Sequence, residues 1–579
     1  MRHPERARAR VRSLSGLSLS FAALLTWACT GTTTGGDDGA LDPGGDDDGG
    51  GGGGNGDGDG DGGGIDPGTP GEGVVSVVLH PGPSIATGEP VVVSFGAPFP
   101  PGAVSDAGLL SARLGEQELA IHAEALLPWR AWPGRADATE SIRAAMISVE
   151  VTFAERAPLE IELAYGEAPG ATLPAPADPR AGWVAVNDGE FPSSVREPAV
   201  YAAFPPAWLS DCLLRSRATP VGGDPAYAWL DDALVGFAHT AVNDVPDAVV
   251  ERIDVTGDAE PWLFDRTMTL FGVHVRTGDV KWLRHAHRSA QFYKGRITGD
   301  GYFDLKDGDL KYAYGRSLLT DYLFTGDPEL LDAIERIAGA GERWDPVYEL
   351  DDNFWTERHQ TYALLAALSA WEASGDARHA ERVSEIVDAS FSLASDPPGN
   401  WPRDGCMLHG MTAHEGAGGD VPICSPWMSA LFADAVWEYY VHSRDERALT
   451  FLADLGQYVL DHGLYDGGEG IDLLMPWYLS SSQKKFSDAG PWGDVEHTCD
   501  VAGLVARGAW ARKQLGGDHA EMSATAATLL EGCAWNLDMW YRPGSTEHGK
   551  AEWRLTPARK FNWWFGTTSD VTWLMSELE

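Results

Sequence analysis

The chain has 579 residues, enough for about three to five domains of ordinary size or for fewer large ones. Hydrophobic residues make up 43% and charged residues 22% of it, so most of the chain can fold around a core. The formal net charge of −43 excludes non-specific nucleic-acid binding, which needs Lys and Arg to displace counterions, and it disfavours anionic membranes. Tryptophan is unusually abundant, with 23 residues, and this excess is a first indication of function.

The N-terminus has the pattern of a secretory signal peptide over residues 1–28. Arginines between positions 2 and 12 precede an apolar stretch at 14–28 that is too short to span a membrane. Cys29 follows Leu25-Thr26-Trp27-Ala28, and a small residue before a cysteine is typical of a bacterial lipoprotein cleavage site, although Thr26 and Trp27 match poorly. Ordinary cleavage nearby is the alternative. Both interpretations predict an exported protein, and the first predicts a lipid anchor at Cys29 on the cell envelope or surface.

Residues 29–72 consist mostly of Gly, Asp, Thr and Pro, with almost no apolar side chains. Such a segment cannot bury enough surface to fold by itself, so we expect a disordered linker that its own negative charge extends. Alternating Asp and Gly at 57–61 would also suit calcium, but the nonapeptide repeat of calcium-binding β-helices is missing.

Residues 73–182 have the pattern of an all-β domain of barrel or sandwich type. Short runs at 74–79, 91–95, 147–151 and 159–163 are rich in β-branched residues, and several of them alternate between apolar and polar side chains. Pro and Gly separate the runs, as turns between strands require. We expect a connecting segment over 183–224 to follow.

From residue 225 to 579 the pattern changes to amphipathic helices that come in pairs. A short turn containing Asp separates the two helices of a pair. These turns are Thr277-Gly278-Asp279, Thr325-Gly326-Asp327, Ser374-Gly375-Asp376, Ser443-Arg444-Asp445 and Gly516-Gly517-Asp518. Glycine suits the left-handed residue that ends a helix, and aspartate caps the next helix by accepting its free amide hydrogens. With helices near 228–243 and 561–578, the pattern predicts about six helical pairs.

Such pairs stack into an open solenoid or close into a ring. The segments between the pairs are unequal in length and rich in Trp, His, Asp and Gly, unlike the regular connections of a solenoid. We therefore predict a multidomain fold, in which an all-β domain is followed by an all-α (α/α)6 toroid of the six-hairpin type.

The start of the predicted β-domain resembles a known family. Residues 88–102 read Gly-Glu-Pro-Val-Val-Val-Ser-Phe-Gly-Ala-Pro-Phe-Pro-Pro-Gly, which is similar to the opening of the N-terminal β-domain in exo-acting rhamnogalacturonan lyase-like proteins. In that family the β-domain precedes an (α/α) toroid. The resemblance covers residues 73–155 by motif and the rest by architecture, and no catalytic motif matches residue by residue. It implies an activity on polysaccharide and leaves the sugar open.

Cysteine usage suits an exported protein, because export permits disulfides. Cys406 and Cys424 would close a short loop, and Cys499 and Cys533 would brace a helical hairpin, which leaves Cys212 unpaired; buried free thiols are the alternative. The chain has no CxxC pair and no HExxH motif, so the sequence indicates no metal site. It requires no cofactor and leaves the need for a divalent cation open.

The segment 351–362 ends a loop and begins a helix, where polar groups can face a cleft. Arg358 and Tyr362 share one helix face, and His359 lies beside them. The candidate catalytic residues here are Asp352, Glu357, Arg358, His359 and Tyr362, and the candidate substrate-binding residues are Asn353 and Trp355. Carboxylates at the start of a helix have a second interpretation as caps.

Two further loops contain candidate side chains. His409 and His414 lie five residues apart in a Gly-rich stretch within the Cys406–Cys424 interval, and Glu496 and His497 lie where another loop enters a helix. We consider His409, His414 and Glu496 as catalytic residues and His497 as a substrate-binding residue. A metal role for the histidines lacks further ligands.

Aromatic side chains in loops can stack on the C–H faces of sugars. The candidates for this role are Trp401, Trp427, Trp477, Tyr478 and Trp492. Trp437, Trp535 and Trp540 lie within predicted helices and are interpreted as packing residues. The basic and aromatic stretch 284–296 would either steer an anionic sugar or form salt bridges along a helix face.

A polysaccharide lyase suits these residues best. It removes the proton beside a uronate carboxylate and expels the glycosidic oxygen, which requires a cation or amide at the carboxylate, a base and an acid. Arg358 with Asn353 would neutralise the carboxylate, His359 or His409 would be the base, and Tyr362 the acid. We favour this mechanism because of the His, Arg and Tyr grouping and the family resemblance.

Two alternatives stay open. An inverting glycoside hydrolase of the (α/α)6 type needs two carboxyls about 6.5–9.5 Å apart, and Asp352 or Glu357 opposite Glu415 or Glu496 would serve. A non-catalytic glycan-binding surface lipoprotein would use the same aromatics without a matched acid and base. In each case the expected partner is a polysaccharide, with no nucleic acid, with a membrane only through the lipid anchor, and with the chain a monomer.

Overall fold

The computed structural model of the protein describes residues 72–135, 141–246, 252–346, 356–415, 421–468, 470–545 and 551–579, with the backbone alone at 414 and 415. These residues belong to the compact unit Gly62–Glu579. The predicted signal peptide, the lipidation candidate Cys29 and nearly all of the predicted linker lie outside the described residues. None of the helices in the described ranges is long and apolar enough to cross a membrane.

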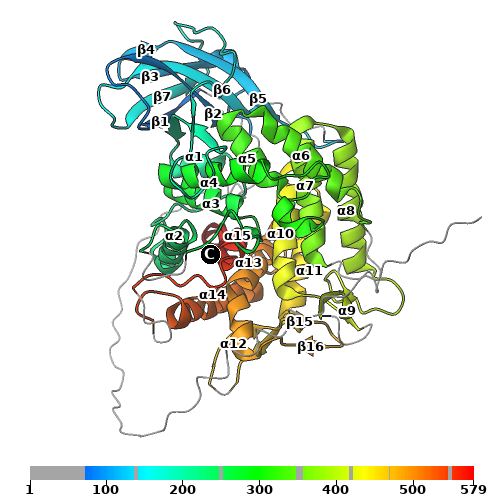
Figure 1. Ribbon diagram of the computed structural model, residues 1–579. Coiled ribbons are helices and arrows are strands. Elements are labelled where there is room, and N and C mark those ends of the chain that lie inside the picture. Colours follow the sequence, from blue (N-terminus) through cyan, green and yellow to red (C-terminus); the bar gives the residue numbers. More distant parts are fainter. Residues whose placement is uncertain are drawn as a thin grey trace, which may run out of the picture. The chain divides into compact units, whose positions relative to one another are not determined.

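The β-region consists, within the described residues, of two antiparallel sheets and a separate hairpin (Figure 1). One sheet has the order β10-β1-β7-β3-β4 and the other has the order β2-β6-β5. The strands are β1 Gly73–Pro81, β2 Pro90–Pro98, β3 Leu110–Leu114, β4 Gln117–Leu119, β5 Ile121–Trp129, β6 Ser141–Thr152, β7 Leu159–Tyr165, β8 Trp183–Ala185, β9 Arg196–Pro198 and β10 Val200–Ala203. Strand β10 extends the first sheet past residue 182, the expected end of the β-domain, because its four buried residues pair with the end of β1.

Six inner helices form a closed ring in the part of the chain that the structure describes. They are α3 Arg266–Thr277, α5 Gly315–Thr325, α7 Glu357–Ser374, α10 Pro426–Ser443, α13 Thr498–Gln514 and α15 Lys560–Thr568. Each packs against the next in this order, and α15 also packs against α3, which closes the ring. Helix α10 is buried along nearly its whole length, as expected of a helix that is apolar on all sides.

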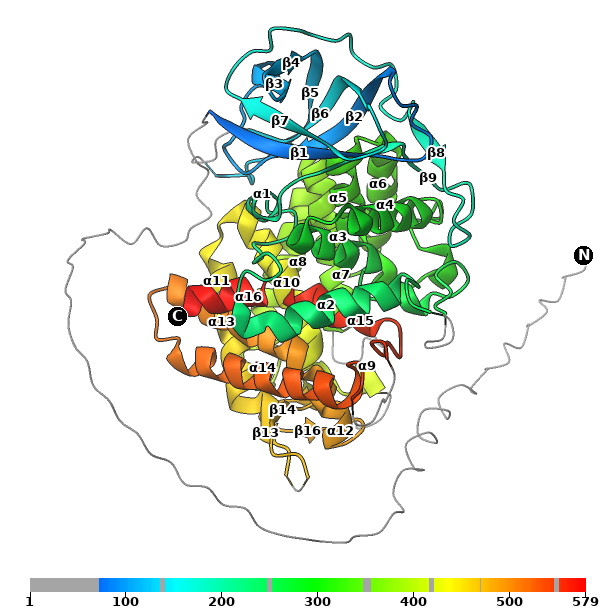
Figure 2. The same cartoon turned by 90° about the vertical axis from the view of Figure 1, so that its left-hand side faces the viewer.

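An outer layer of helices surrounds this ring. It contains α2 Ala228–Ala241, α4 Val280–Lys294, α6 Pro328–Gly341, α8 Ala377–Ser395, α11 Glu446–Tyr458 and α14 Ala520–Trp540. Figure 2 shows α2 and α15 side by side, where the first and last parts of the helical region meet. Short helices α1 Pro206–Asp211, α9 Thr412–Glu415, α12 Pro491–Asp494 and α16 Val571–Leu578 complete the set. The predicted arrangement of a β-region followed by paired helices is therefore present.

The five predicted turns lie where inner helices end and outer helices begin. Gly278, Gly326 and Gly375 have φ of +68°, +64° and +71°, the left-handed conformation that glycine adopts without strain. Arg444 takes the same role with a φ of 54°. The aspartates that follow each accept a hydrogen bond from the amide two residues further on. All these short turns are at one end of the ring, so the long unequal loops are at the other.

The β-region covers the end of the ring that carries the short turns. The guanidinium of Arg130 donates to the Glu372 carbonyl over 2.7 Å, and the Trp132 ring centroid lies 4.7 Å from that of Trp371. Gly96 on β2 meets the C-terminal end of α5 so closely that a Cβ atom would lie 2.2 Å from the Leu323 carbonyl oxygen. Strand β6 is consequently buried on both faces, with the other sheet on one side and the ring on the other.

A buried ion network fills the middle of the ring. Asp434 on α10 forms ion pairs with three arginines, Arg215, Arg316 and Arg507. Arg316 also pairs with Glu438, and Arg507 with Asp570. Every member is at most 7% exposed. The network links α5, α10 and α13 with the connecting segment and the start of α16, so it joins parts of the chain that are distant in sequence.

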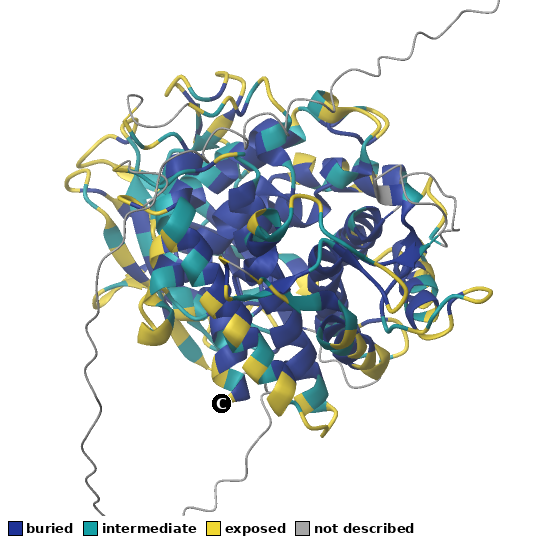
Figure 3. Cartoon of the chain, turned by 90° about the horizontal axis from the view of Figure 1, so that it is seen from below, coloured by how far each residue is buried: buried dark blue, intermediate teal, exposed yellow. Residues whose placement is uncertain are grey.

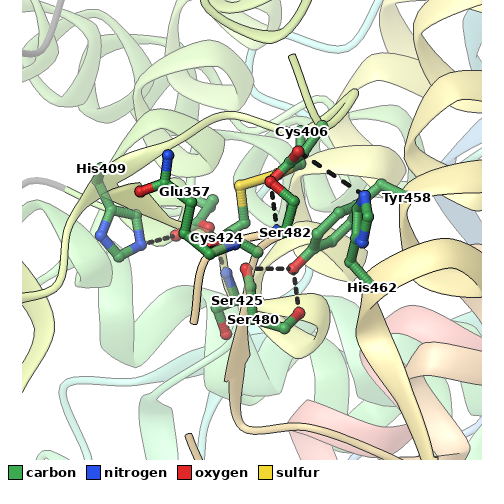
Figure 4. Close-up of a disulfide and its surroundings, with 12 residues drawn as sticks. Glu357, Cys406, His409, Cys424, Ser425, Tyr458, His462, Ser480 and Ser482 are labelled. Atoms are coloured by element: carbon green, nitrogen blue, oxygen red, sulfur yellow. Dashed lines mark hydrogen bonds and ion pairs between the residues drawn. A yellow bond between two sulfur atoms is a disulfide. The ribbon is translucent and has the colours of Figure 1, made fainter. Parts of the chain in front are cut away.

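Two disulfides are present, and they are the two pairs that the spacing favoured. Cys406 is bonded to Cys424, and Cys499 to Cys533. Cys212 is a buried free thiol. The first disulfide holds the loop before α10 against the hairpin β15 Leu479–Ser480 and β16 Lys485–Phe486, because Cys424 also exchanges backbone hydrogen bonds with Ser480 (Figure 4).

Candidate functional site

The candidate site lies at the end of the ring where the inner helices begin. The first five inner helices are each followed by an outer helix that returns, and α15 packs beside α2 with its start hydrogen-bonded to Glu496 just before α13. The inner helices therefore share one direction, and their N-terminal ends meet at this end. Figure 3 views the molecule from this side and shows buried helices in the middle with exposed residues around them. The N-terminal ends of helices carry positive partial charge, so several of them together favour an anionic ligand.

Five rings form an aromatic cluster at this end: Trp427 and Trp563 lie on inner helices, Phe264 and His497 lie just before inner helices, and Tyr478 lies in a loop. The His497 ring stacks on Trp427 with centroids 5.1 Å apart and lies 4.4 Å from Trp563. Trp427 and Trp563 are themselves 5.1 Å apart. Tyr478 is half-buried, whereas the other members are at most 8% exposed. The cluster is therefore a mostly buried set of stacked rings that includes an imidazole, and Tyr478 is its most exposed member.

A cation and a histidine–aspartate pair flank the same tryptophan. The Arg358 guanidinium carbon lies 5.3 Å from the Trp427 ring centroid, and Arg358 is half-buried. Nδ1 of His497 lies 3.4 Å from Oδ2 of Asp500, which also accepts a hydrogen bond of 2.8 Å from the Trp563 indole. Burial raises the pKa of Asp500, and its contacts with His497 and Trp563 oppose the rise. This arrangement directs Nδ1–H of His497 to Asp500 and leaves Nε2 to accept a proton.

A small cavity of about 20 Å³ lies beneath the aromatic cluster, with Phe264 and Asp265 in its lining. That volume suffices for a water molecule. Phe264 and Asp265 are both left-handed, with φ of 72° and 60°, although neither is glycine. Two adjacent non-glycine residues with a left-handed backbone conformation cost free energy, and such backbone strain is found most often at functional sites.

Asp265 has an unusual proton affinity. Burial raises its pKa to about 6, against a hydrogen bond from the Met268 amide and the nearby Arg316. Tyr362, four per cent exposed, lines the same cavity, and burial raises its pKa as well. A carboxyl that titrates near pH 6 can donate or accept a proton under ordinary conditions.

The raised pKa of Asp265 predicts a pH-dependent stability. Below its pKa in the unfolded chain, the Asp265 carboxyl is protonated in both the folded and the unfolded protein. Above its folded-state pKa of about 6 it is ionised in both, so folding must bury a charge. Stability therefore falls as pH rises between these values, by about 2–3 kcal/mol. We expect Asp265→Asn, which keeps a capping oxygen, to remove this fall. The difference in the free energy of unfolding between parent and variant, measured by denaturant titration from about pH 4 to about pH 8, tests it. A difference independent of pH would contradict the expectation.

A cluster of three polar side chains, Glu496, Tyr541 and Lys560, joins the starts of α13 and α15. Oε1 of Glu496 accepts hydrogen bonds of 2.6 Å from both the Tyr541 hydroxyl and the Lys560 ammonium. Burial lowers the pKa of Lys560, although the carboxylate of Glu496 opposes this. Glu496 is half-buried, so of the three it is the group that solvent reaches most easily. The group also holds Trp564, whose indole donates to the Glu496 carbonyl.

Three of the predicted catalytic residues have structural roles, and His359 is the first of them. His359 closes a capping box with Thr356, because its Nδ1 accepts from the Thr356 amide while the Thr356 side chain caps the helix. Burial lowers the pKa of His359, and Arg358 lowers it further. His359 therefore has a structural role as part of a helix cap. The capping interpretation that the sequence offered for the carboxylates applies here to a histidine.

Glu357 and His409 form a buried pair, and both side chains are at most 1% exposed. Nε2 of His409 lies 3.1 Å from Oε2 of Glu357, whose Oε1 accepts a hydrogen bond of 2.8 Å from the Ser425 amide (Figure 4). Burial would raise the pKa of Glu357, but the pair with His409 holds it below its usual value. The pair thus ties the loop of the first disulfide to the starts of α7 and α10.

The other predicted residues are distributed around the same end of the ring. Trp477 stacks on Tyr465 with centroids 4.0 Å apart, Trp401 is half-buried against the core, and Trp492 is 49% exposed. Asp352, Asn353 and Trp355 lie outside the described residues, as do the side chains of His414 and Glu415.

The basic stretch on α4 forms salt bridges and does not face the candidate site. Arg288 pairs with Glu197 and Asp188, and His287 pairs with Asp321. These contacts attach the β8–β9 hairpin region to the outer side of the ring. Of the two interpretations of this stretch, the structure supports salt bridging along the helix.

Sequence reasoning did not single out Asp500, Trp563, Phe264 and Lys560. Asp500 was detectable, because it lies three residues after His497 at the start of one helix, where such pairs meet. Trp563 and Lys560 lie in a segment that was recognised only as a helix. Phe264 precedes an inner helix in a way that no local pattern marks.

No group of three or more His, Cys, Asp or Glu side chains in the described residues is arranged to hold a metal ion. No protein-family model matches the chain, and no curated protein sequence matches it.

The comparison with solved structures gives matches of low similarity. An unsaturated glucuronyl hydrolase from Streptococcus agalactiae is 12% identical, with a TM-score of 0.40, over 63% of this chain and 94% of that one. A cellobiose 2-epimerase from Bacillus thermoamylovorans is 11% identical, with a TM-score of 0.37, over 58% and 99%. An α-1,6-mannanase variant from Salegentibacter sp. is 13% identical, with a TM-score of 0.38, over 58% and 98%.

Proposed function

We propose that the protein is a polysaccharide lyase that cleaves a uronate-containing glycan by β-elimination at the aromatic cluster. One observation carries the proposal: Arg358 and the His497–Asp500 pair flank the same ring, Trp427. A cation for the carboxylate and an oriented base are the two groups that the first half of this reaction requires.

The reaction follows from these positions. Arg358 binds the uronate carboxylate and stabilises the negative charge that spreads onto it when the neighbouring C–H bond breaks. Nε2 of His497 takes that proton, while Asp500 stabilises the imidazolium. The electron pair forms the C=C bond and expels the glycosidic oxygen. Tyr478, whose ring centroid lies 5.6 Å from that of His497, would protonate the leaving oxygen.

This assignment changes the base and the acid from those expected. His497 replaces His359 and His409, which the structure uses as a cap and in a buried pair. Tyr478 replaces Tyr362, because Tyr478 is a half-buried member of the aromatic cluster, whereas Tyr362 lines the internal cavity. Arg358 keeps the role that the sequence predicted.

An inverting glycoside hydrolase is the second candidate. Asp265 and Asp500 both have raised pKa values, and they lie on two sides of the contact between Phe264 and Trp563. A carboxyl with a raised pKa suits the general acid of a glycosidase. A glycan-binding lipoprotein, the third interpretation, would use the aromatic cluster to bind sugar without a catalytic acid and base.

The full chain would be incubated with polygalacturonate, rhamnogalacturonan, alginate and a neutral mannan. Ultraviolet absorbance of the unsaturated uronate and new reducing ends would be recorded together. We expect both signals to rise in parallel on an acidic polymer and neither to rise on mannan. New ends without absorbance would replace the lyase with the hydrolase, and neither signal on any polymer would refute both enzymatic candidates.

A further inference from the structure

Three tryptophans form an exposed group beside the candidate site. Trp492 on α12 is 49% exposed, and its ring centroid lies 6.2 Å from Trp535 and 6.0 Å from Trp540 on α14. We call these three residues the tryptophan platform. Trp535 and Trp540 are half-buried, so packing within the helical layer, the interpretation from sequence, accounts for only part of their surface.

The platform is connected to the candidate site at two points. Helix α12 leads directly into the short helix Val495–His497, which carries Glu496 and His497. Tyr541, the residue after Trp540, donates a hydrogen bond of 2.6 Å to Glu496. The platform is therefore close to the aromatic cluster along the chain, and the Tyr541 hydrogen bond links the end of α14 to the short helix that carries His497. Both groups lie at the end of the ring where the inner helices begin.

The composition of the platform favours a sugar over a protein partner. Among the described residues, the exposed large apolar side chains are Val74, Val92, Leu109, Val221, Trp344, Trp492 and Leu515. None of the aliphatic ones lies on α12 or α14, so Trp492 has no exposed aliphatic neighbour on either helix. Protein interfaces have an apolar core of mixed side chains, whereas indole faces with polar groups beside them suit the C–H surfaces and hydroxyls of sugars.

Polar groups of this kind are present at the C-terminal end of α14 and just beyond it. Asp538 and Arg542 form an exposed ion pair of 3.0 Å one turn apart. Asp538 lies three residues after Trp535, which places the two side chains on neighbouring positions of the helix surface. A carboxylate and a guanidinium next to an indole can bind the hydroxyls of a sugar and, through the guanidinium, a uronate carboxylate.

We propose that the tryptophan platform is a second glycan-binding site, which holds a sugar unit of the same chain at a distance from the unit that reacts. The preferred substrate would then be a polymer or a long oligosaccharide and not a disaccharide. The inference rests on the proposed function for the reacting unit, but the platform binds glycan whether or not the site eliminates.

Binding would be measured by affinity electrophoresis of the full chain in native gels that contain polygalacturonate, rhamnogalacturonan, alginate or mannan. We expect retardation of the parent by at least one acidic polymer. Trp492→Ala should raise the dissociation constant from the retardation series about fivefold to tenfold, the size of a lost aromatic contact. Leu515→Ala is the matched control, because Leu515 is 44% exposed at the other end of α13, and it should bind as the parent does.

A second readout separates the platform from the reaction itself. If the polymer is cleaved, Trp492→Ala should raise KM more for long oligosaccharides than for short ones. The proposal is overturned if no gel retards the parent, if Trp492→Ala is retarded like the parent, or if the variant loses long and short substrates equally. Retardation that depends on Trp492 without any unsaturated product would support the platform and refute the lyase.

Discussion

Replacing Asp434 with Ala should lower the free energy of unfolding by about 3–5 kcal/mol, because it removes one partner from a buried ion network. Asp434 is 5% exposed and lies between three guanidinium groups in the middle of the ring. Arg316 keeps Glu438 and Arg507 keeps Asp570 as partners in the variant. Arg215 keeps only neutral acceptors, so the variant buries a cation without a carboxylate.

The measurement is the midpoint and slope of denaturant unfolding for the full chain. Asp388→Ala is the matched control, because it also removes the carboxylate partner of an arginine. The ion pair of Asp388 with Arg447 is about 60% exposed, so its loss should lower the free energy of unfolding by less than about 1 kcal/mol. The three arginines hold the pKa of Asp434 well below its usual value, against the effect of burial. Its contribution is therefore present above the unfolded-state pKa and is lost only as pH falls below it. Equal effects of the two substitutions would show that the network does not stabilise the ring.

Sequence reasoning was most accurate where one local rule decides the structure. The turns at Gly278, Gly326 and Gly375 need a left-handed residue followed by a capping aspartate, and both requirements are visible in three letters. Asp445 belongs to the same pattern, although its left-handed neighbour is Arg444. The two disulfides are likewise the pairs that chain spacing favoured.

The ion network was invisible in the sequence because its members lie far apart along the chain. Arg215 belongs to a connecting segment and Asp570 to the last turn before the C-terminal helix, yet both reach the middle of the ring. The burial of strand β6 on both faces has the same cause, since it depends on the ring that begins more than a hundred residues later. Contacts of this kind are fixed by the tertiary fold and leave no periodic pattern.

At the candidate site, the loops chosen from the sequence contribute residues to the aromatic cluster, but we propose a different base and a different acid from those expected. His359 and His497 both stand at the start of an inner helix, and nothing local distinguishes a cap from a ring that stacks in a cluster. The distinction comes from the partners, Thr356 for the first and Trp427, Trp563 and Asp500 for the second. Residue type and loop position therefore indicate where a site lies more reliably than which group acts.

His497→Ala should reduce kcat on the cleaved polymer by about 10²–10⁴-fold, the usual contribution of a general base, with a smaller change in KM. The reason is that His497 is held by Asp500 through Nδ1 and by ring contacts on two sides, which leaves Nε2 as the proton acceptor. Asp500→Asn should also reduce kcat, because an amide neither fixes the tautomer nor stabilises the imidazolium. Added imidazole should restore part of the activity of His497→Ala and none of that of Asp500→Asn.

Arg358→Ala tests the proposed role of Arg358 in binding the uronate carboxylate. A cation that binds the carboxylate in the ground state and in the transition state affects both kinetic constants, so KM should rise while kcat falls.

His519→Ala is the control for histidine removal, since His519 precedes α14 at the opposite end of the ring and its side chain forms no cap there. If His497→Ala stays within about threefold of the parent in kcat, it is a stacking residue and not the base, because a lost general base costs far more than that. The raised pKa of Asp265 would then make that carboxyl the group to substitute next, and the hydrolase the mechanism to test.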